Sequence, residues 1–245
     1  MKHLGIYFIA TSNYKTGFQY FQKNLHLLYP EMKKTVIILS DGLEEWDGIV
    51  EGNTSYIVYK IPHYPWPIIT LFKMKYILDY RIPCDYICYV NGNLQINPKF
   101  DFSKINEYID LDKLNVTRHS WYLVDTFEDK NGSAYDKGLK KESRSYIPEP
   151  YIYIQAAFFI GPTMLVRRMC EDVCNMCEAD LKENIIPNYH DESYLNRYIY
   201  VRSKEYGSKS IVYPPRKLIH PSFDYKYPFA LIDTFIKDRY LFDEY

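Results

Sequence analysis

The sequence predicts an α/β fold with a mainly parallel sheet flanked by helices. Three observations carry this prediction. Strand-like apolar segments alternate with segments of helical spacing over the first 93 residues. The segment 35–40 is apolar throughout, as expected for a strand covered on both faces. Hydrophobic residues make up 47% and charged residues 25% of the 245 positions, which suits a soluble globular core.

The elements of the first half follow in the order strand, helix, strand, strand, helix, strand. The first expected strand is apolar and rich in residues that favour strands. The first expected helix has apolar side chains at helical spacing and stops at Pro30. The motif HYPWP ends the third strand. The expected strands are 4–11, 35–40, 55–61 and 84–90, and the expected helices are 17–29 and 68–80.

The second half is expected to form a polar loop at 125–143, a strand at 151–161, helices at 162–183 and 188–200, and an irregular tail. Pro162 suits the first turn of its helix. Cys170, Cys174 and Cys177 share one helical face, and a buried stripe explains them better than a metal site. The chain shows no repeat and no linker. We therefore expect a single domain over 1–245.

Charge and cysteine content exclude several classes of protein. Thirty basic and thirty-one acidic residues give a net charge of −1, without the basic surplus that nucleic-acid binding needs. Five cysteines favour a reducing compartment over a disulfide framework. No signal peptide or spanning apolar run is evident, so a cytoplasmic location is expected. The 27 tyrosines suit stacking on sugars or bases, and equally suit tyrosine-rich cores.

Asn91-Gly92-Asn93 follows the fourth expected strand in the segment YVNGNLQI. One interpretation is a hairpin turn, which Asn-Gly favours. The other is a platform for a diphosphate, since ligands of parallel sheets bind at the carboxyl ends of strands. Residues 9–14 would end at the same edge. Asparagines there have the shape and acceptor oxygens of an Asp-x-Asp pair, but lack the charges that hold a divalent cation.

Two further motifs precede expected helices. In HDES, residues 190–193, Asp191 would cap a helix, or Glu192 would act on a sugar as nucleophile or charge stabiliser. In PWP, Trp66 is interpreted as a buried residue at the start of a helix. Lys73 and Lys75 lie about 200° apart on a helix, so at most one of them faces a given ligand.

Six segments resemble glycosyltransferase family 6, in order and over roughly residues 4 to 200. They are IYFIATSNY, PWPIITLFKMK, CDYICYVNGN, SYIP, YIQAAFFIG and NYHDESYLNRY. That family contains the blood-group A and B transferases, the α1,3-galactosyltransferase and smaller bacterial relatives. The resemblance implies a Rossmann-like GT-A fold. Its nucleotide-binding half would be at about 1–93, and its acceptor-binding and catalytic half, with a C-terminal closing segment, at about 94–245. The resemblance also implies a retaining hexosyltransferase that moves galactose or N-acetylgalactosamine from its UDP-sugar to the 3-hydroxyl of a terminal galactose, fucosylated or not.

The resemblance assigns site residues by position. Ile9, Thr11 and Tyr14 would hold the uridine, with the Tyr14 ring against uracil. Lys73 corresponds to an arginine near the donor phosphates. The residues that would select or contact the donor sugar are Gln155, Ala156, Ala157 and Asp191. Glu192 corresponds to the catalytic glutamate and would also contact the acceptor, beside His119 and Trp121. A membrane-linked glycan as acceptor would bring the protein to the inner face of the membrane.

Departures from the family pattern qualify the assignment. Asn91 and Asn93 replace the metal-binding aspartates, so we expect no metal or other cofactor. Lys73, Lys237 and Arg239 would then offset the diphosphate charge, the last two from a closing C-terminal segment. Ile68 replaces an aspartate, Ile160 replaces a glycine, and 125–143 does not match. A degenerate GT-A domain that only binds nucleotide-sugar or glycan stays an alternative, as does an inverting or unrelated enzyme of the same fold.

Overall fold

The computed structural model describes residues 1–118, 142–148, 153–206, 218–220 and 225–231. The chain divides into two units, and each draws on separate parts of the sequence. Unit 1 contains Met1–His63, Pro83–Tyr108 and the described residues from Leu218 on, and unit 2 contains Tyr64–Ile82 and Ile109–Lys217. These boundaries differ from the expected halves at 1–93 and 94–245, which concern binding roles and stay a prediction.

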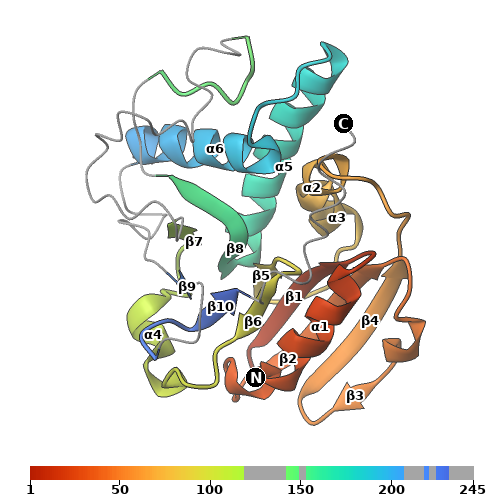
Figure 1. The fold of residues 1–245 in the computed structure, drawn as a ribbon. Coiled ribbons are helices and arrows are strands. Elements are labelled where there is room, and N and C mark those ends of the chain that lie inside the picture. The colour runs from red at the N-terminus through yellow and green to blue at the C-terminus, as the bar shows by residue number, and fades with distance from the viewer. Residues whose placement is uncertain (119–141, 149–152, 207–217, 221–224, 232–245) are drawn as a thin grey trace. The chain divides into compact units, whose positions relative to one another are not determined.

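Unit 1 is built on a sheet of mostly parallel strands, in the order β3-β4-β2-β1-β5 (Figure 1). Its strands are β1 (His3–Ala10), β2 (Lys33–Ser40), β3 (Val50–Glu51), β4 (Thr54–Lys60) and β5 (Tyr86–Val90). β1 runs parallel to both β2 and β5, β4 runs parallel to β2, and the edge strand β3 is antiparallel. The α/β prediction and its four strands in this region are confirmed. The two-residue β3 is too short for its pattern to stand out from a turn.

Helix α1 (Tyr14–Lys23) covers this sheet and is followed by the 3₁₀ turn η1 (Leu25–Leu27). Phe18 and Phe21 are fully buried, with ring centroids 5.4 and 5.3 Å from that of Phe8 on β1. The helix was expected at 17–29. Its apolar spacing continues into η1, so the pattern did not reveal that the α-helix ends at Lys23.

The remaining elements of unit 1 are short. Strand β6 (Leu94–Ile96) pairs antiparallel with β10 (Phe229–Leu231), which runs parallel to β9 (Ile219–His220). The others are η2 (Glu44–Trp46), η3 (Phe102–Lys104) and α4 (Ile105–Tyr108). Since β6 and β10 are about 130 residues apart, their pairing gave no local signal in the sequence.

Unit 2 contains two long helices beside a two-stranded ladder. Helices α5 (Thr163–Lys182) and α6 (His190–Tyr206) pack against each other and against β8 (Ile154–Pro162) (Figure 1). β8 pairs antiparallel with β7 (Asn115–Arg118), with an irregularity between Val116 and Thr117. On α5, Cys170 and Cys177 of the expected stripe are buried together with Met169 and Val173, whereas Cys174 is only half-buried.

The helix expected at 68–80 is broken into α2 (Ile68–Leu71) and α3 (Lys73–Asp79), which meet at Phe72. α3 packs against α5. Lys73 is buried while Lys75 is exposed and pairs with Asp79 at 2.9 Å, so the two lysines do face different ways. None of the helices in the described ranges combines the length and apolar character needed to cross a membrane.

Candidate functional site

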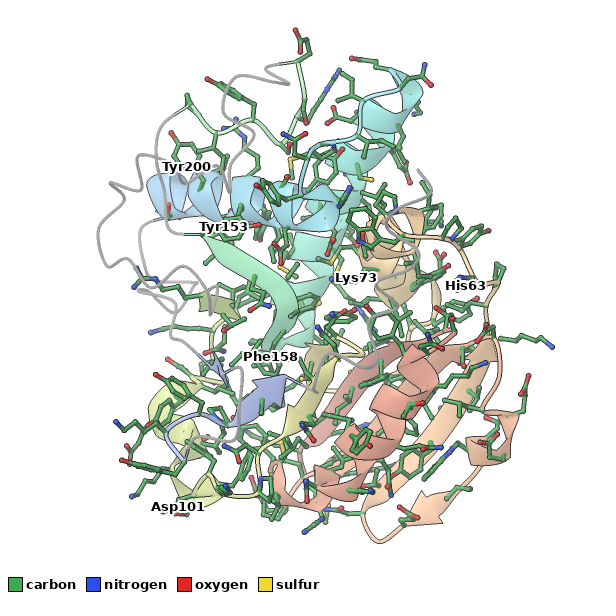
Figure 2. All side chains as sticks on the ribbon, viewed as in Figure 1. His63, Lys73, Asp101, Tyr153, Phe158 and Tyr200 are labelled. Carbon is green, nitrogen blue, oxygen red and sulfur yellow. The ribbon has the colours of Figure 1, made fainter. Side chains whose placement is uncertain are left out.

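A buried ion pair joins three elements of unit 2. The ammonium Nζ of Lys73 on α3 lies 2.5 Å from Oδ2 of Asp191 in the first turn of α6. The same ammonium donates a hydrogen bond of 2.8 Å to the carbonyl of Ala156 on β8. The two side chains are only 4% and 10% exposed. Lys73 is labelled in Figure 2. The resemblance assigned Lys73 and Asp191 to the same ligand, the sugar donor, and in the structure the two side chains contact each other directly.

Glu192 lies beside this pair and has two hydrogen-bond donors of its own. The backbone N–H of Ala156 donates to Oε1 at 3.1 Å, and the hydroxyl of Tyr153 donates to Oε2. Burial, followed by the charge of Asp191, raises the pKa of Glu192 to about 7, although Tyr153, the Ala156 N–H and Lys73 act in the opposite direction. A buried carboxyl group whose pKa lies near neutrality is a candidate for catalysis.

The start of α6 aims both carboxylates away from their own helix. His190 has a φ of +49°, in the left-handed region that non-glycine residues seldom adopt. Its ring meets Trp66 edge to face, with centroids 4.4 Å apart, and its N–H bonds to the carbonyl of Pro187. Asp191 and Glu192 thus both contact elements other than their own helix, and neither serves only as a helix cap. Trp66 is 53% exposed, so the expectation of a buried tryptophan there is wrong.

The expected donor-sugar residues form consecutive positions on β8. Gln155, Ala156 and Ala157 are all buried. The side-chain oxygen of Gln155 has no hydrogen-bond partner among the described residues. A buried acceptor without a donor is costly.

Two residues of this cluster were missed by sequence reasoning. Tyr153 precedes β8 and bonds to Glu192, as described above. Asn196 lies one turn after Glu192 on α6, and its amide bonds to the backbone N–H and carbonyl of Ile154 and to the carbonyl of Glu192. Both belong to the quoted segments 151–161 and 188–200. No spacing rule in either segment connects Tyr153 to a carboxylate on another element.

The Asn91-Gly92-Asn93 turn in unit 1 follows β5. The next strand, β6, pairs with β10 rather than with β5, so the hairpin interpretation is wrong. The amide of Asn91 donates to the side-chain oxygen of Asn93 at 2.7 Å, and the Tyr89 hydroxyl donates to that of Asn91 at 3.1 Å. Both amide oxygens therefore already have a donor. In the described ranges, no group of three or more His, Cys, Asp or Glu side chains is arranged to hold a metal.

The expected uridine residues lie where β1 ends. Ile9 and Thr11 are buried, and Tyr14 begins α1. A β-carbon at position 92 would lie 2.7 Å from Cδ1 of Tyr14, so the turn needs Gly92 to accommodate that ring. The structure thus brings Tyr14 to the asparagine turn. His119, Trp121, Lys237 and Arg239 lie outside the described residues.

Comparisons with known proteins reveal similar sequences. Residues 62–215 match the sequence model of glycosyltransferase family 6. The chain is 30% identical over 209 residues to the O-antigen biosynthesis glycosyltransferase WbnI of Escherichia coli. This alignment covers 80% of this chain and 82% of that protein. It is 23% identical over 168 residues to the ubiquinone biosynthesis protein COQ4 homolog, mitochondrial, of Plasmodium falciparum (isolate 3D7), covering 65% of this chain but only 37% of that protein. The family match contains the whole Lys73–Asp191–Glu192 cluster.

Proposed function

The chain belongs to glycosyltransferase family 6, and we propose that it is a retaining transferase for galactose or N-acetylgalactosamine. In this proposal the donor is a UDP-sugar and the acceptor hydroxyl is the 3-OH of a terminal galactose. The α/β fold is consistent with the GT-A type, and family membership implies a nucleotide-sugar donor and a glycan acceptor. The observation that carries the proposal is the buried cluster of Glu192, Asp191 and Lys73 inside the family match.

Glu192 is proposed to act on the donor sugar in its ionised form. An oxocarbenium-like transition state develops positive charge at the anomeric carbon, and a buried carboxylate stabilises it strongly. Glu192 would either attack that carbon as its bond to UDP breaks and form a glycosyl-enzyme, or stabilise the charge while UDP leaves and the acceptor attacks from the same side. In the first case the acceptor hydroxyl then displaces Glu192. In both cases the acceptor oxygen bonds to the anomeric carbon and gives up its proton. Asp191, held by Lys73 and so fixed in direction, would bind a hydroxyl of the same sugar.

Donor choice is proposed to depend on Ala157. Its methyl group is buried on β8 and would crowd an acetamido substituent, which favours galactose. Ala157→Gly is expected to raise the preference for UDP-N-acetylgalactosamine over UDP-galactose by roughly tenfold, the effect of about one carbon in a fitted pocket. The ratio of the two kcat/KM values measures it. An unchanged ratio would show that another residue selects the sugar.

Metal independence is the second part of the proposal. Asn91 and Asn93 are uncharged and their oxygens already accept hydrogen bonds, so they suit a hard divalent cation poorly. The ammonium of Lys73 is shared with Asp191 and Ala156. Lys237 and Arg239 are therefore proposed to carry much of the charge that offsets the leaving UDP.

The deciding experiment is a transfer assay with UDP-galactose and a fucosylated galactoside, run with EDTA and with added manganese. Activity that survives EDTA is the expected result. Activity only with manganese would contradict the argument from Asn91 and Asn93. Binding of UDP-sugar without transfer or hydrolysis in either condition would instead support a degenerate binding domain. The anomeric configuration of the product, measured by NMR, separates a retaining from an inverting enzyme.

The acceptor and the compartment are proposed on narrower grounds. One relative is named for O-antigen biosynthesis, which makes a bacterial surface glycan, assembled on a membrane-linked carrier, a reasonable acceptor. All five cysteines are free thiols, and three of them are buried. Free thiols of this kind support action in the reducing cytoplasm.

A further inference from the structure

The phenol of Tyr153 is the side-chain donor that contacts Glu192 directly. Its hydroxyl donates to Oε2, while the Ala156 N–H donates to Oε1. We propose that Tyr153 is a positioning residue that keeps Glu192 ionised and fixed in direction for catalysis. This role rests on the proposed function of Glu192, and it adds a residue that the resemblance to the family did not assign.

The ring of Tyr153 is held in place by packing. It is 7% exposed and forms a buried cluster with Ile147 and Tyr200, against which Val201 packs. The ring of Tyr189 meets it edge to face, with centroids 6.1 Å apart. A phenol fixed on several sides presents its hydroxyl with little loss of side-chain freedom (Tyr153 and Tyr200 are labelled in Figure 2).

The charges around Glu192 explain why such a donor is needed. The groups that act on it are Asp191 on its own helix, Lys73 on α3, Tyr153, and the N–H of Ala156 on β8. Lys73 and Asp191 form a pair whose charges largely cancel. Among the described residues, an ionised Glu192 is thus a negative charge of this cluster without a cationic partner of its own, and burial favours its protonated form.

Hydrogen bonds to the ionised form are what oppose this tendency. An ionised carboxylate accepts hydrogen bonds only, and Tyr153 and Ala156 supply one donor to each of its oxygens. Phenylalanine at 153 would retain the ring and its packing but leave Oε2 without its donor. The pKa of Glu192 should then rise, because the charged form alone is stabilised by that bond.

The test compares the pH dependence of kcat/KM for wild type, Tyr153→Phe and Tyr200→Phe. In the wild type, activity should fall as pH decreases through the pKa of Glu192. Tyr153→Phe should move this acid limb upward by about one pH unit, the size expected for one hydrogen bond to a charged group. The loss relative to wild type should therefore be greatest at low pH and should diminish above the limb. Tyr200→Phe removes a hydroxyl from the same cluster and should leave the limb in place.

A second measurement does not depend on turnover. The titration of the ¹³C-labelled Glu192 side chain, assigned with Glu192→Gln, is followed by NMR in all three proteins. A higher midpoint in Tyr153→Phe alone supports the proposal. An unchanged midpoint, or an equal shift in Tyr200→Phe, overturns it. Absence of transfer by the wild type with either UDP-sugar would refute the proposed function, and the NMR midpoints would still decide whether Tyr153 keeps Glu192 ionised.

Discussion

Glu192→Gln is expected to lower kcat by roughly two orders of magnitude or more, with little change in the affinity for UDP. Glutamine has the shape of glutamate but lacks the charge that stabilises an oxocarbenium-like state or forms a glycosyl-enzyme. The glutamine amide also has only one acceptor oxygen, whereas the glutamate offers one oxygen to Tyr153 and the other to the Ala156 N–H. UDP affinity should persist because the substitution concerns the sugar. Steady-state turnover and calorimetric titration with UDP measure the two quantities.

Glu178→Gln is the matched control for this variant. Glu178 lies on the exposed side of α5 and undergoes the same chemical change away from the cluster. It should retain the wild-type kcat. If Glu192→Gln also kept a kcat near that of the wild type, Glu192 would not be the catalytic carboxylate, and the proposed mechanism would have to be abandoned.

Lys73→Met is expected to lower the free energy of unfolding by about 3–5 kcal/mol and to abolish transfer. The side chains of Lys73 and Asp191 are almost fully buried, and removing the lysine leaves the aspartate as an unpaired charge in the interior. The carbonyl of Ala156 would lose a donor as well. Urea denaturation, followed by the change in midpoint at constant slope, measures the loss of stability.

The chain supplies a control two residues away. Lys75 pairs with Asp79 across exposed side chains, and such pairs contribute about 0–1 kcal/mol. Lys75→Met should therefore stay close to wild type in stability and activity. The double variant Lys73→Met/Asp191→Asn should regain part of the lost stability without activity, since position 191 then no longer carries a buried charge that has lost its partner. Equal losses in Lys73→Met and Lys75→Met would show that the buried pair has no special role.

The sequence was sufficient where the signal is local. Apolar segments fixed the parallel strands of unit 1, because a strand covered on both faces needs a continuous apolar run. The buried stripe of α5 and the divergent directions of Lys73 and Lys75 followed from helical periodicity. The motif HDES, together with five other segments, identified the family, which the match over 62–215 confirms.

Local pattern failed where two alternatives had the same local appearance. Asn91-Gly92 suits a hairpin, and only the pairing of β6 with β10 excludes it. The apolar spacing of 68–80 suits one helix, yet the structure breaks it at Phe72. Trp66 beside two prolines suits a buried position, but more than half of it is exposed. In each case tertiary contacts overrode a correct but incomplete local preference.

The sequence by itself therefore determined the class of fold and the family, and it named residues of the candidate site. Only the tertiary structure decided which of those residues touch. Lys73 and Asp191 are 118 positions apart, and Tyr153 and Glu192 are 39 apart. Propensity and periodicity act over a few residues, whereas these contacts depend on how α3, β8 and α6 pack. The charge state of Glu192 depends on the same packing, because burial raises its pKa and the donors from neighbouring elements lower it.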